Sequence, residues 1–438
     1  MCGTLQVPLD YSDSSKGTIV IPVVKVPATD PTQRIGSLLV NPGGPGASGV
    51  QFVEEALAST FVTLNRRFDI VGFDPRGIGG PDVIACLTPT QFDEVVAADP
   101  IVDDPAEKQT MIDTNKLLAT SCQDKVGRLL PYVGTDNVVR DLDALRAALG
   151  DDKITYFGFS YGTDIGSHYA QMFPTHIRAM VLDGDVDTSI PLISAVEQQA
   201  DSLSKNYQEF LRRCTASSAC PMGTDPGGAI NRLLSSLDTT PIRGPDGRLI
   251  GRGEGLVALL GSMYDATVWN EIYILFGRAI TSGDVAGLEL LLDTYTGRGQ
   301  DHRMESGPAV DCVDYSVPTD LATYDAEAAK TEARDPYFGD SAVYGILPCA
   351  YWPVHGSPAK PVSVSGAPPI VLIGATNDPA TPYPWSQSLQ KQIQGSVLLT
   401  RDGYGHTSYD FSTCIAGHVD AYLDDLTIPA AGITCPSN

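Results

Sequence analysis

Three residues that lie far apart in the chain have the types and the order needed for nucleophilic catalysis. The first is Ser160, the central residue of the G-x-S-x-G motif in "GFSYG". An apolar stretch precedes this motif and a helical pattern follows it, which is typical of a strained turn that exposes a serine hydroxyl. Such a hydroxyl needs a histidine as base, and the base needs a carboxylate to orient it. The motif therefore predicts a serine nucleophile whose two partners come later in the chain.

His406 is the candidate base. It lies in the loop "RDGYGHTSY", directly after the apolar stretch "SVLLT". In this arrangement the histidine follows the nucleophile and the acid in chain order, on a loop after a strand. The remaining histidines come too early, lie in the middle segment or fall in the last predicted helix: His168, His176, His302, His355 and His418. The sequence therefore predicts His406 as the general base.

Asp378 is the candidate acid. It lies in "IGATNDPATP", on the loop that follows the apolar strand "PIVLI". Asp183, in "VLDGDVD" after the preceding core strand, is an alternative position for the same role, and Asp185 and Asp187 are lesser ones. We favour Asp378, and these alternatives stay open at the level of sequence.

Alternating strands and helices must position these three residues. Strand patterns occupy residues 17–26, 37–40, 68–74, 153–160 and 178–184, and helical patterns occupy 137–150 and 161–173, with Thr135 or Asp136 as the N-cap of the first. This alternation predicts an α/β core, a mostly parallel sheet with helices on both faces. We expect residues 1–189 to form its first part and residues 362–438 its second part, which carries Asp378 and His406. Residues 190–361 read as a helical cap insertion, whose longest amphipathic stretch is 255–280.

A glycine-rich loop, "NPGGPGASG" at residues 41–49, follows one of the early strands. From Gly44 it matches the G-x-G-x-x-G pattern of a dinucleotide site, and Asp74 comes at about the distance of a ribose-binding carboxylate. However, Pro42 and Pro45 remove N–H donors that a pyrophosphate would need. The downstream serine, acid and histidine instead require a second oxyanion donor besides the backbone N–H of Tyr161. The loop is therefore predicted to complete an oxyanion hole.

Seven motifs in fixed order carry a family resemblance: "VPLDY", "NPGGPGASG", "FDIVGFDPRGIGG", "GFSYGT", "MVLDG", "GATNDPATP" and "GYGHTS". Together they resemble the secreted actinobacterial tripeptidyl/prolyl aminopeptidase-like α/β-hydrolases, serine peptidases of the proline iminopeptidase clan with a helical cap and a TAP-like C-terminal segment. The resemblance implies an α/β-hydrolase fold with Ser160 as nucleophile, Asp378 as acid and His406 as base. It also aligns the glycine loop with H-G-G-P-G, with Pro42 in place of the histidine, which points to Gly44 as the oxyanion donor.

The nine cysteines predict disulfides. No C-x-x-C motif or Cys/His cluster occurs in the sequence, so we expect neither a metal nor a cofactor. The resemblance implies the pairs Cys86–Cys122, Cys214–Cys220, Cys312–Cys349 and Cys414–Cys435, and we expect Cys2 to be unpaired. Disulfides indicate an oxidising compartment. The chain starts "MCGTLQVPLDY", without the basic and apolar regions of a signal peptide, and we expect that one was removed from a secreted protein.

Charge and hydropathy limit the partners. Lys and Arg total 29 against 53 Asp and Glu, so the net charge of −24 repels nucleic acid and anionic membranes. No apolar run approaches the roughly 18–20 residues of a membrane span. We expect a peptide or a small ester as substrate.

Two functions are compatible with the predicted residues. The first is an exopeptidase that acts on free N-termini, and the alternative is a carboxylesterase or lactonase with the same triad. An exopeptidase must bind an ammonium group, for which Glu254, Asp265 and Glu271 of the insertion are candidates. An esterase would need only an apolar cleft, which residues 263–276 could line, although a helix packed on the core explains that stretch equally well.

Overall fold

The computed structural model describes residues 1–335 and 337–438 and contains a nine-stranded sheet with the strand order β1-β2-β4-β3-β5-β6-β9-β10-β11. The strands are β1 (Cys2–Pro8), β2 (Thr18–Val26), β3 (Gly36–Asn41), β4 (Phe68–Phe73), β5 (Ile154–Phe159), β6 (Ile177–Asp183), β9 (Val371–Asn377), β10 (Val397–Tyr404) and β11 (Thr434–Pro436). Pairing is antiparallel only at β1–β2 and β2–β4, and parallel from β4 to β11. This is the predicted α/β-hydrolase fold, with the G-x-S-x-G turn directly after the central strand β5.

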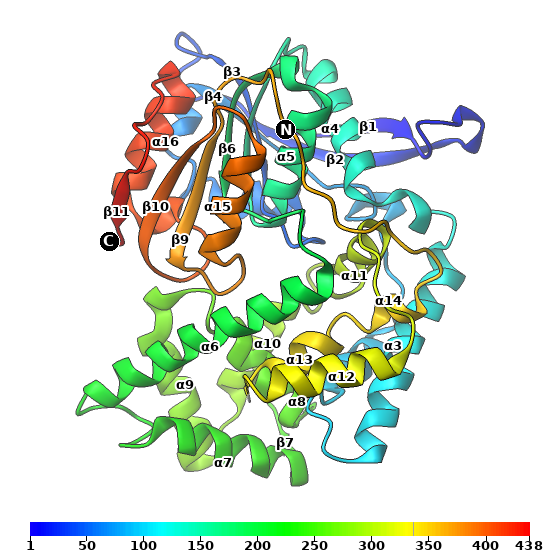
Figure 1. Ribbon diagram of the computed structural model, residues 1–438, viewed down its shortest axis with the longest axis vertical. Helices are drawn as coiled ribbons and strands as arrows, with labels where there is room; N and C mark the ends of the chain where they lie inside the picture. The colour runs from blue at the N-terminus through cyan, green and yellow to red at the C-terminus, as the bar shows by residue number, and fades with distance from the viewer. Residues whose placement is uncertain (336) are drawn as a thin grey trace.

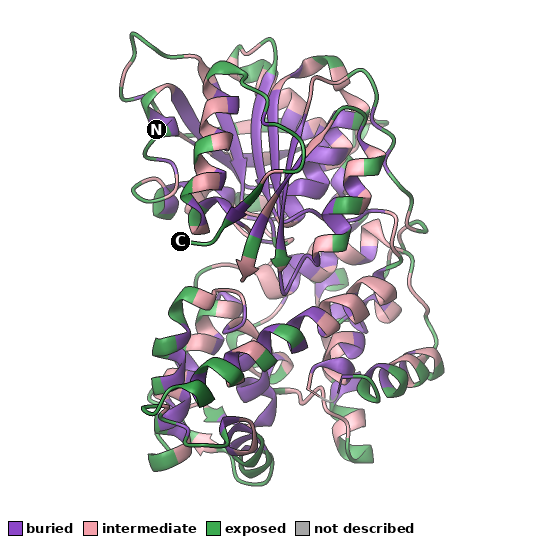
Figure 2. Cartoon of the chain, turned by 60° about the vertical axis from the view of Figure 1, so that its left-hand side comes forward, coloured by how far each residue is buried: buried purple, intermediate pink, exposed green. Residues whose placement is uncertain are grey.

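Helices cover both faces of the sheet (Figure 1). On one face, α1 (Gly49–Ala56) and α16 (Thr413–Asp425) pack on side chains such as Leu38 and Phe157. On the other face, α4 (Thr135–Leu149), α5 (Tyr161–Met172) and α15 (Tyr383–Gln392) pack on neighbouring side chains such as Leu39 and Tyr156. Successive residues of β3 and β5 thus enter opposite cores, because side chains alternate across a strand. The central strands are therefore buried on both faces (Figure 2).

A second group of helices lies beyond the carboxyl ends of the strands (Figure 1). It contains α6 (Leu192–Ala216), α7 (Pro226–Thr239), α8 (Arg252–Gly261), α9 (Trp269–Ser282), α10 (Ala286–Thr296), α11 (Arg303–Asp314), α12 (Leu321–Glu332), α13 (Gly339–Tyr344) and α14 (Pro348–Tyr351), with the hairpin β7 (Ile242–Arg243) and β8 (Leu249–Ile250). We call α6 to α14 the cap. The cap has its own buried core, formed by side chains such as Phe210, Leu259 and Phe276. None of the helices in the described part of the chain combines the length and hydropathy needed to cross a bilayer.

Two further helices, α2 (Pro89–Ala97) and α3 (Pro105–Val126), precede the cap in sequence but pack against it. α2 contacts α8, and α3 contacts α14. The Arg252 guanidinium at the start of α8 donates to both oxygens of Asp103 and to Glu107 at the start of α3. The helical layer over the sheet is therefore built from two separate segments of sequence.

The structure divides one predicted stretch into two helices and corrects one predicted helix cap. The stretch 255–280 is divided into α8 and α9 by residues 262–268, where Asp265 caps a short turn by accepting from the Thr267 N–H over 2.8 Å. The N-cap of α4 is Gly134 rather than Thr135 or Asp136. The Thr135 hydroxyl does not cap the helix because it bonds to Tyr161 and Asp314 instead.

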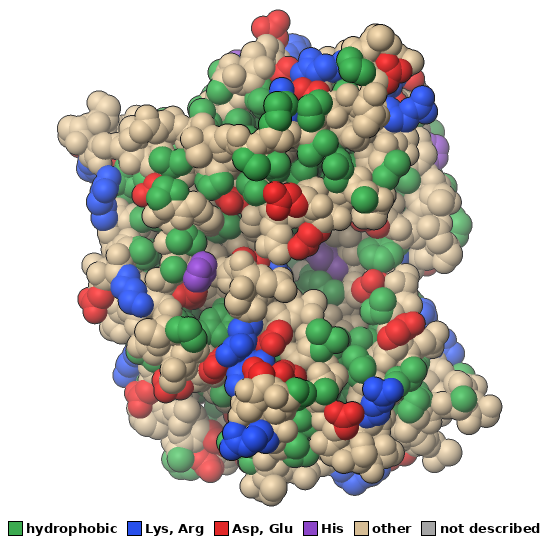
Figure 3. All heavy atoms as spheres, turned by 180° about the vertical axis from the view of Figure 1, so that it is seen from behind, with side chains coloured by type: hydrophobic (Ala, Val, Ile, Leu, Met, Phe, Trp, Pro, Cys, Tyr) green, Lys and Arg blue, Asp and Glu red, His purple; other side chains and the backbone are tan. Residues whose placement is uncertain are grey.

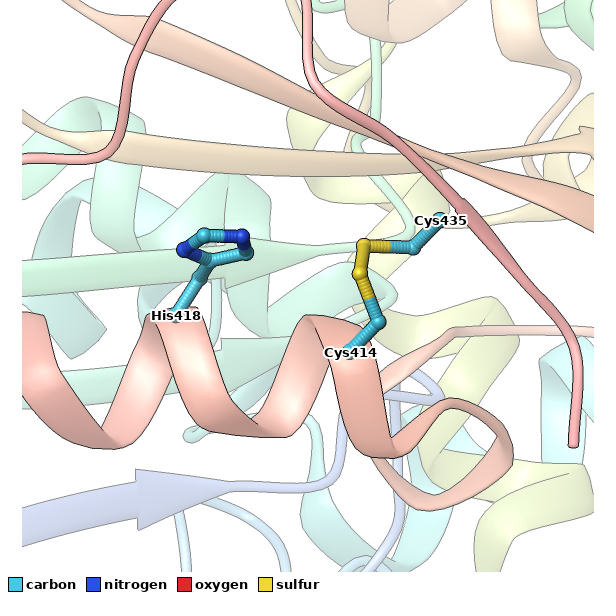
Figure 4. Close-up of side chains that lie close together, drawn as sticks. All are labelled: Cys414, His418 and Cys435. Carbon is cyan, nitrogen blue, oxygen red and sulfur yellow. A yellow bond between two sulfur atoms is a disulfide. The ribbon is translucent and has the colours of Figure 1, made fainter.

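All four predicted disulfides are present, namely Cys86–Cys122, Cys214–Cys220, Cys312–Cys349 and Cys414–Cys435. Cys2 is exposed and unpaired, as expected. His418 lies near the last pair, but both sulfurs are joined to each other, so these three residues do not form a metal site (Figure 4). The bond ties α16 to β11 at the edge of the sheet.

Candidate active site

Ser160 occupies a strained turn between β5 and α5. Its φ of 54° and ψ of −125° lie in a region that residues other than glycine rarely adopt. Its flanking glycines are required sterically, since a Cβ at Gly158 would lie 2.3 Å from the carbonyl oxygen of Gly162. The Ser160 N–H donates to the Asp183 carbonyl over 2.9 Å, which fixes the turn to the next strand, β6. The serine is thereby held at the carboxyl edge of the sheet, where it is partly exposed.

His406 lies on the loop after β10 and pairs with Asp378 on the loop after β9. Its Nδ1 is 2.9 Å from Asp378 Oδ1 and 3.0 Å from Oδ2. Nε2 is buried and has no hydrogen-bond partner among the described residues. No hydrogen bond joins Ser160 and His406 in this structure, but the ring borders Gly184, where a Cβ would lie 3.2 Å from His406 Cε1. Since Gly184 directly follows the residue that anchors the Ser160 N–H, the imidazole lies next to the serine turn.

Asp378 is fully buried and held by backbone amides. Oδ1 accepts from the N–H groups of Ala380 and Thr381 over 2.9 and 2.8 Å, and Oδ2 accepts from Thr407 N–H over 3.0 Å. Burial alone would raise the pKa of Asp378, but His406 and these amide donors outweigh it and lower the pKa below its ordinary value. Asp378 is therefore a carboxylate whose charge faces the imidazole.

The alternative acids do not contact the histidine. Asp183 Oδ2 accepts from the N–H groups of Ser408 and Tyr409 over 2.9 and 2.8 Å, and burial raises the pKa of Asp183 to about 7. Burial likewise raises the pKa of Asp185 well above its ordinary value. Asp187 accepts from the N–H and hydroxyl of Ser189. Of the four aspartates considered from the sequence, Asp378 is the one that the structure brings to His406.

The glycine loop after β3 approaches the serine turn closely. A Cβ at Gly43 would lie 2.5 Å from the Phe159 carbonyl oxygen and 2.8 Å from Tyr161 N, and the φ of Gly43 is 93°. Gly43 N–H donates to Asn41 Oδ1 over 2.9 Å, whereas the next amide, at Gly44, has no acceptor in the described structure. Tyr161 N–H, at the start of α5, likewise has none. These two amides are therefore available as oxyanion donors.

The acidic residue suggested by the dinucleotide pattern has a different role. Asp74 Oδ1 accepts from the Ser48 hydroxyl over 2.6 Å and from Val50 N–H over 3.1 Å at the start of α1. It therefore anchors the end of the glycine loop.

Tyr264 of the cap is a site residue that sequence reasoning missed. Its carbonyl oxygen accepts from His406 N–H over 2.8 Å, and its ring stands edge-on to the imidazole with 5.5 Å between centroids. Nothing in the local sequence indicates this contact, because it depends on how the cap docks on the sheet. The cap therefore helps to position the histidine loop.

The predicted cap residues for substrate mostly have structural roles. Glu254 is buried and accepts from Gly251 N–H over 3.0 Å at the start of α8, and Glu271 is exposed on α9. In residues 263–276, side chains such as Trp269 and Phe276 are buried in the core of the cap. Packing therefore explains this stretch.

Seen from behind, the molecule is hollowed between sheet and cap, with histidine and acidic side chains at the hollow (Figure 3).

Comparisons with known proteins identify the family of this chain. A family model described as "TAP-like protein" matches residues 335–435. Serine protease Hip1 of Mycobacterium tuberculosis is 36% identical over 99% of this chain and 87% of its own length. Carboxylesterase B of the same species is 36% identical over 99% and 86%, and tripeptidyl aminopeptidase of Streptomyces lividans is 30% identical over 99% and 83%. The chain therefore belongs to this TAP-like family of serine hydrolases with the α/β-hydrolase fold.

Proposed function

We propose that the chain is an exopeptidase that releases short peptides or residues from free N-termini, with Ser160, His406 and Asp378 as its catalytic triad. The observation that carries this proposal is the pairing of His406 Nδ1 with the buried Asp378, which leaves Nε2 free beside the strained serine turn. A histidine with its Nδ1–H donated to a carboxylate presents a basic Nε2. The named relatives support a peptidase, because two of the three are called serine protease and tripeptidyl aminopeptidase.

In the proposed reaction, the Ser160 hydroxyl attacks the carbonyl carbon of the scissile bond while His406 Nε2 takes its proton. Asp378 holds the imidazole in the required tautomer and stabilises the imidazolium. The backbone N–H groups of Gly44 and Tyr161 donate to the oxyanion of the tetrahedral intermediate. His406 then protonates the leaving amine, and a water deprotonated by His406 releases the acyl group from Ser160.

A carboxylesterase is the second candidate, and the relative named Carboxylesterase B favours it. The same triad serves both reactions, so substrates must separate them. We expect free tripeptide, dipeptide or prolyl chromogenic amides to be hydrolysed and their N-acetylated forms to resist. Turnover of short-chain esters with every amide inert would instead establish the esterase. Ser160→Ala, assayed on the same panel, should retain only trace activity.

The proposal also covers the cellular location of the protein and the extent of its cap. Four disulfides indicate a protein that folds outside the cytoplasm, and we propose that it is secreted. The contacts of α2 and α3 with the cap support an extension of the functional lid beyond residues 190–361, to include these two helices.

A further inference from the structure

The cap helix α11 packs directly on the glycine loop that carries the proposed oxyanion donor. A Cβ atom at Gly307 would lie 3.0 Å from the carbonyl oxygen of Pro45. Residues three and four apart share one face of a helix, so Asp311 and Asp314 continue the face of α11 on which Gly307 lies. Two carboxylates of the cap therefore lie along the side of α11 that meets the catalytic loops.

The first helix after the nucleophile adds a third carboxylate. Asp164 lies three residues after Tyr161, about 4.5 Å along the axis of α5. The Tyr161 hydroxyl lies 2.7 Å from Thr135 Oγ1, which in turn donates to Asp314 Oδ2 over 2.6 Å. This chain of hydrogen bonds joins the start of α5 to the end of α11. Asp164, Asp311 and Asp314 thus form one acidic group beside the proposed nucleophile.

Two of these carboxylates lack the partners that buried carboxylates normally have. Asp164 is 3% exposed, and no hydrogen bond from a described residue reaches its Oδ1. Its nearest cation is His168, whose Nε2 is 3.4 Å away and whose Nδ1 also contacts Asp136 at 3.2 Å. Asp311 is half-buried, and within the described chain its carboxylate has neither a hydrogen bond nor an ion pair. One histidine therefore serves both Asp164 and Asp136, and no cation of the described chain pairs with Asp311.

We propose that Asp311, supported by Asp164, forms a subsite for an ammonium group of the substrate. A cation at this position would gain a charge-assisted partner and relieve the repulsion between the carboxylates. Three extended residues span about 10 Å, which exceeds the rise from Tyr161 to Asp164. A short peptide bound at Ser160 is therefore long enough for its α-ammonium, or a lysine side chain, to reach the acidic group. The subsite rests on the proposed peptidase function and specifies the charged group that its substrate carries.

The first test uses the wild-type enzyme and hydrolysis of p-nitrophenyl butyrate, a neutral substrate. Trialanine should inhibit this reaction at least about tenfold more strongly than N-acetyl-trialanine, because burying a carboxylate–ammonium contact stabilises the complex by a factor of that order. N-acetyl-Ala-Lys-Ala distinguishes the two sources of ammonium, since strong inhibition by this blocked peptide assigns the subsite to a side chain. Equal inhibition by all three peptides would overturn the proposal.

The second test removes the charge at the subsite. In Asp311→Asn, the ratio of kcat/KM for a free tripeptide amide to kcat/KM for the butyrate ester should fall at least about tenfold, mainly through KM. Glu271→Gln, which removes an equal charge from the exposed face of α9, should keep the wild-type ratio. An unchanged ratio in Asp311→Asn would refute the subsite and leave the peptidase proposal standing. A wild-type enzyme that hydrolyses the ester and no peptide would refute the peptidase proposal itself. If Asp311→Asn does not fold, the inhibition test on the wild-type enzyme still tests the subsite.

Discussion

Replacing the two buried aspartates near the histidine loop separates the proposed triad acid from its alternative. In Asp378→Asn, one carboxylate oxygen becomes an NH2 group. Asp378 Oδ1 accepts from the N–H groups of Ala380 and Thr381, and Oδ2 accepts from Thr407 N–H, while both oxygens contact His406 Nδ1. The new NH2 group therefore faces backbone donors on either side and favours the imidazole tautomer that carries its proton on Nε2.

A histidine in that tautomer cannot take the serine proton, so we expect kcat to fall about 10⁴-fold, or about 5.4 kcal/mol of transition-state stabilisation. In Asp183→Asn, the remaining carbonyl oxygen can still accept from Ser408 and Tyr409, and no contact with the imidazole is lost. This variant should lose less than about tenfold. The assay is steady-state hydrolysis of p-nitrophenyl butyrate, with thermal unfolding to confirm that each variant is folded. A larger loss in Asp183→Asn than in Asp378→Asn would refute the assignment of the acid.

Three further predictions concern stability and the glycine loop. Burial raises the pKa of Asp183 from 3.8 to about 7, so between these values the folded protein holds a proton on Asp183 that the unfolded chain has released. The contribution of this group to stability is therefore full below pH 3.8 and is lost as pH rises through 7. This difference in pKa corresponds to at most about 4 kcal/mol of unfolding free energy. The fall in Tm from pH 5 to pH 8 should therefore be smaller in Asp183→Asn than in the wild type. An identical fall in the two proteins would contradict this prediction. Replacing both Cys312 and Cys349 by serine opens a loop of 37 residues and should cost about 4 kcal/mol in urea unfolding, so a loss under about 1 kcal/mol would contradict the role of this bond. Gly43→Ala should lower kcat about 10²- to 10³-fold, because the added Cβ pushes the loop away from the serine turn. The control is Gly150→Ala, since Gly150 also has a positive φ but open space around it; this variant should lose about 1 kcal/mol of stability and keep its kcat. Equal kcat values for the two variants would argue against the oxyanion role of the loop.

The sequence predicts the inner strands of the sheet and the loops that carry the three candidate residues, but not the edge strands β1 and β11. Each candidate residue lies on a short loop directly after a strand, where the apolar stretch and the turn residues are local signals. The sequence alone does not distinguish the two candidate acids, because Asp183 and Asp378 both follow core strands. The path of the loop after β10 distinguishes them. It brings the His406 imidazole to Asp378, whereas Asp183 accepts a hydrogen bond from the backbone N–H of Ser408, two residues after His406.

The remainder of the site depends on contacts between distant segments. Tyr264 reaches His406 because the cap docks over the sheet, which no local periodicity encodes. Thr135 has the sequence context of an N-cap, but its hydroxyl joins Tyr161 to Asp314, 179 residues away. The acids that the sequence suggests as amine ligands are helix caps or surface residues, whereas Asp311 differs from them only in having no partner among the described residues.

Covalent labelling identifies the nucleophilic serine directly. A fluorophosphonate reacts with an activated serine and leaves a stable adduct, which intact-mass spectrometry counts and peptide mapping locates. We predict one adduct per wild-type chain, on the peptide that contains Ser160, no adduct in Ser160→Ala, and labelling in His406→Ala that is slower by orders of magnitude. A full adduct on Ser160→Ala, or one that maps to another residue in the wild type, would show that Ser160 is not the nucleophile.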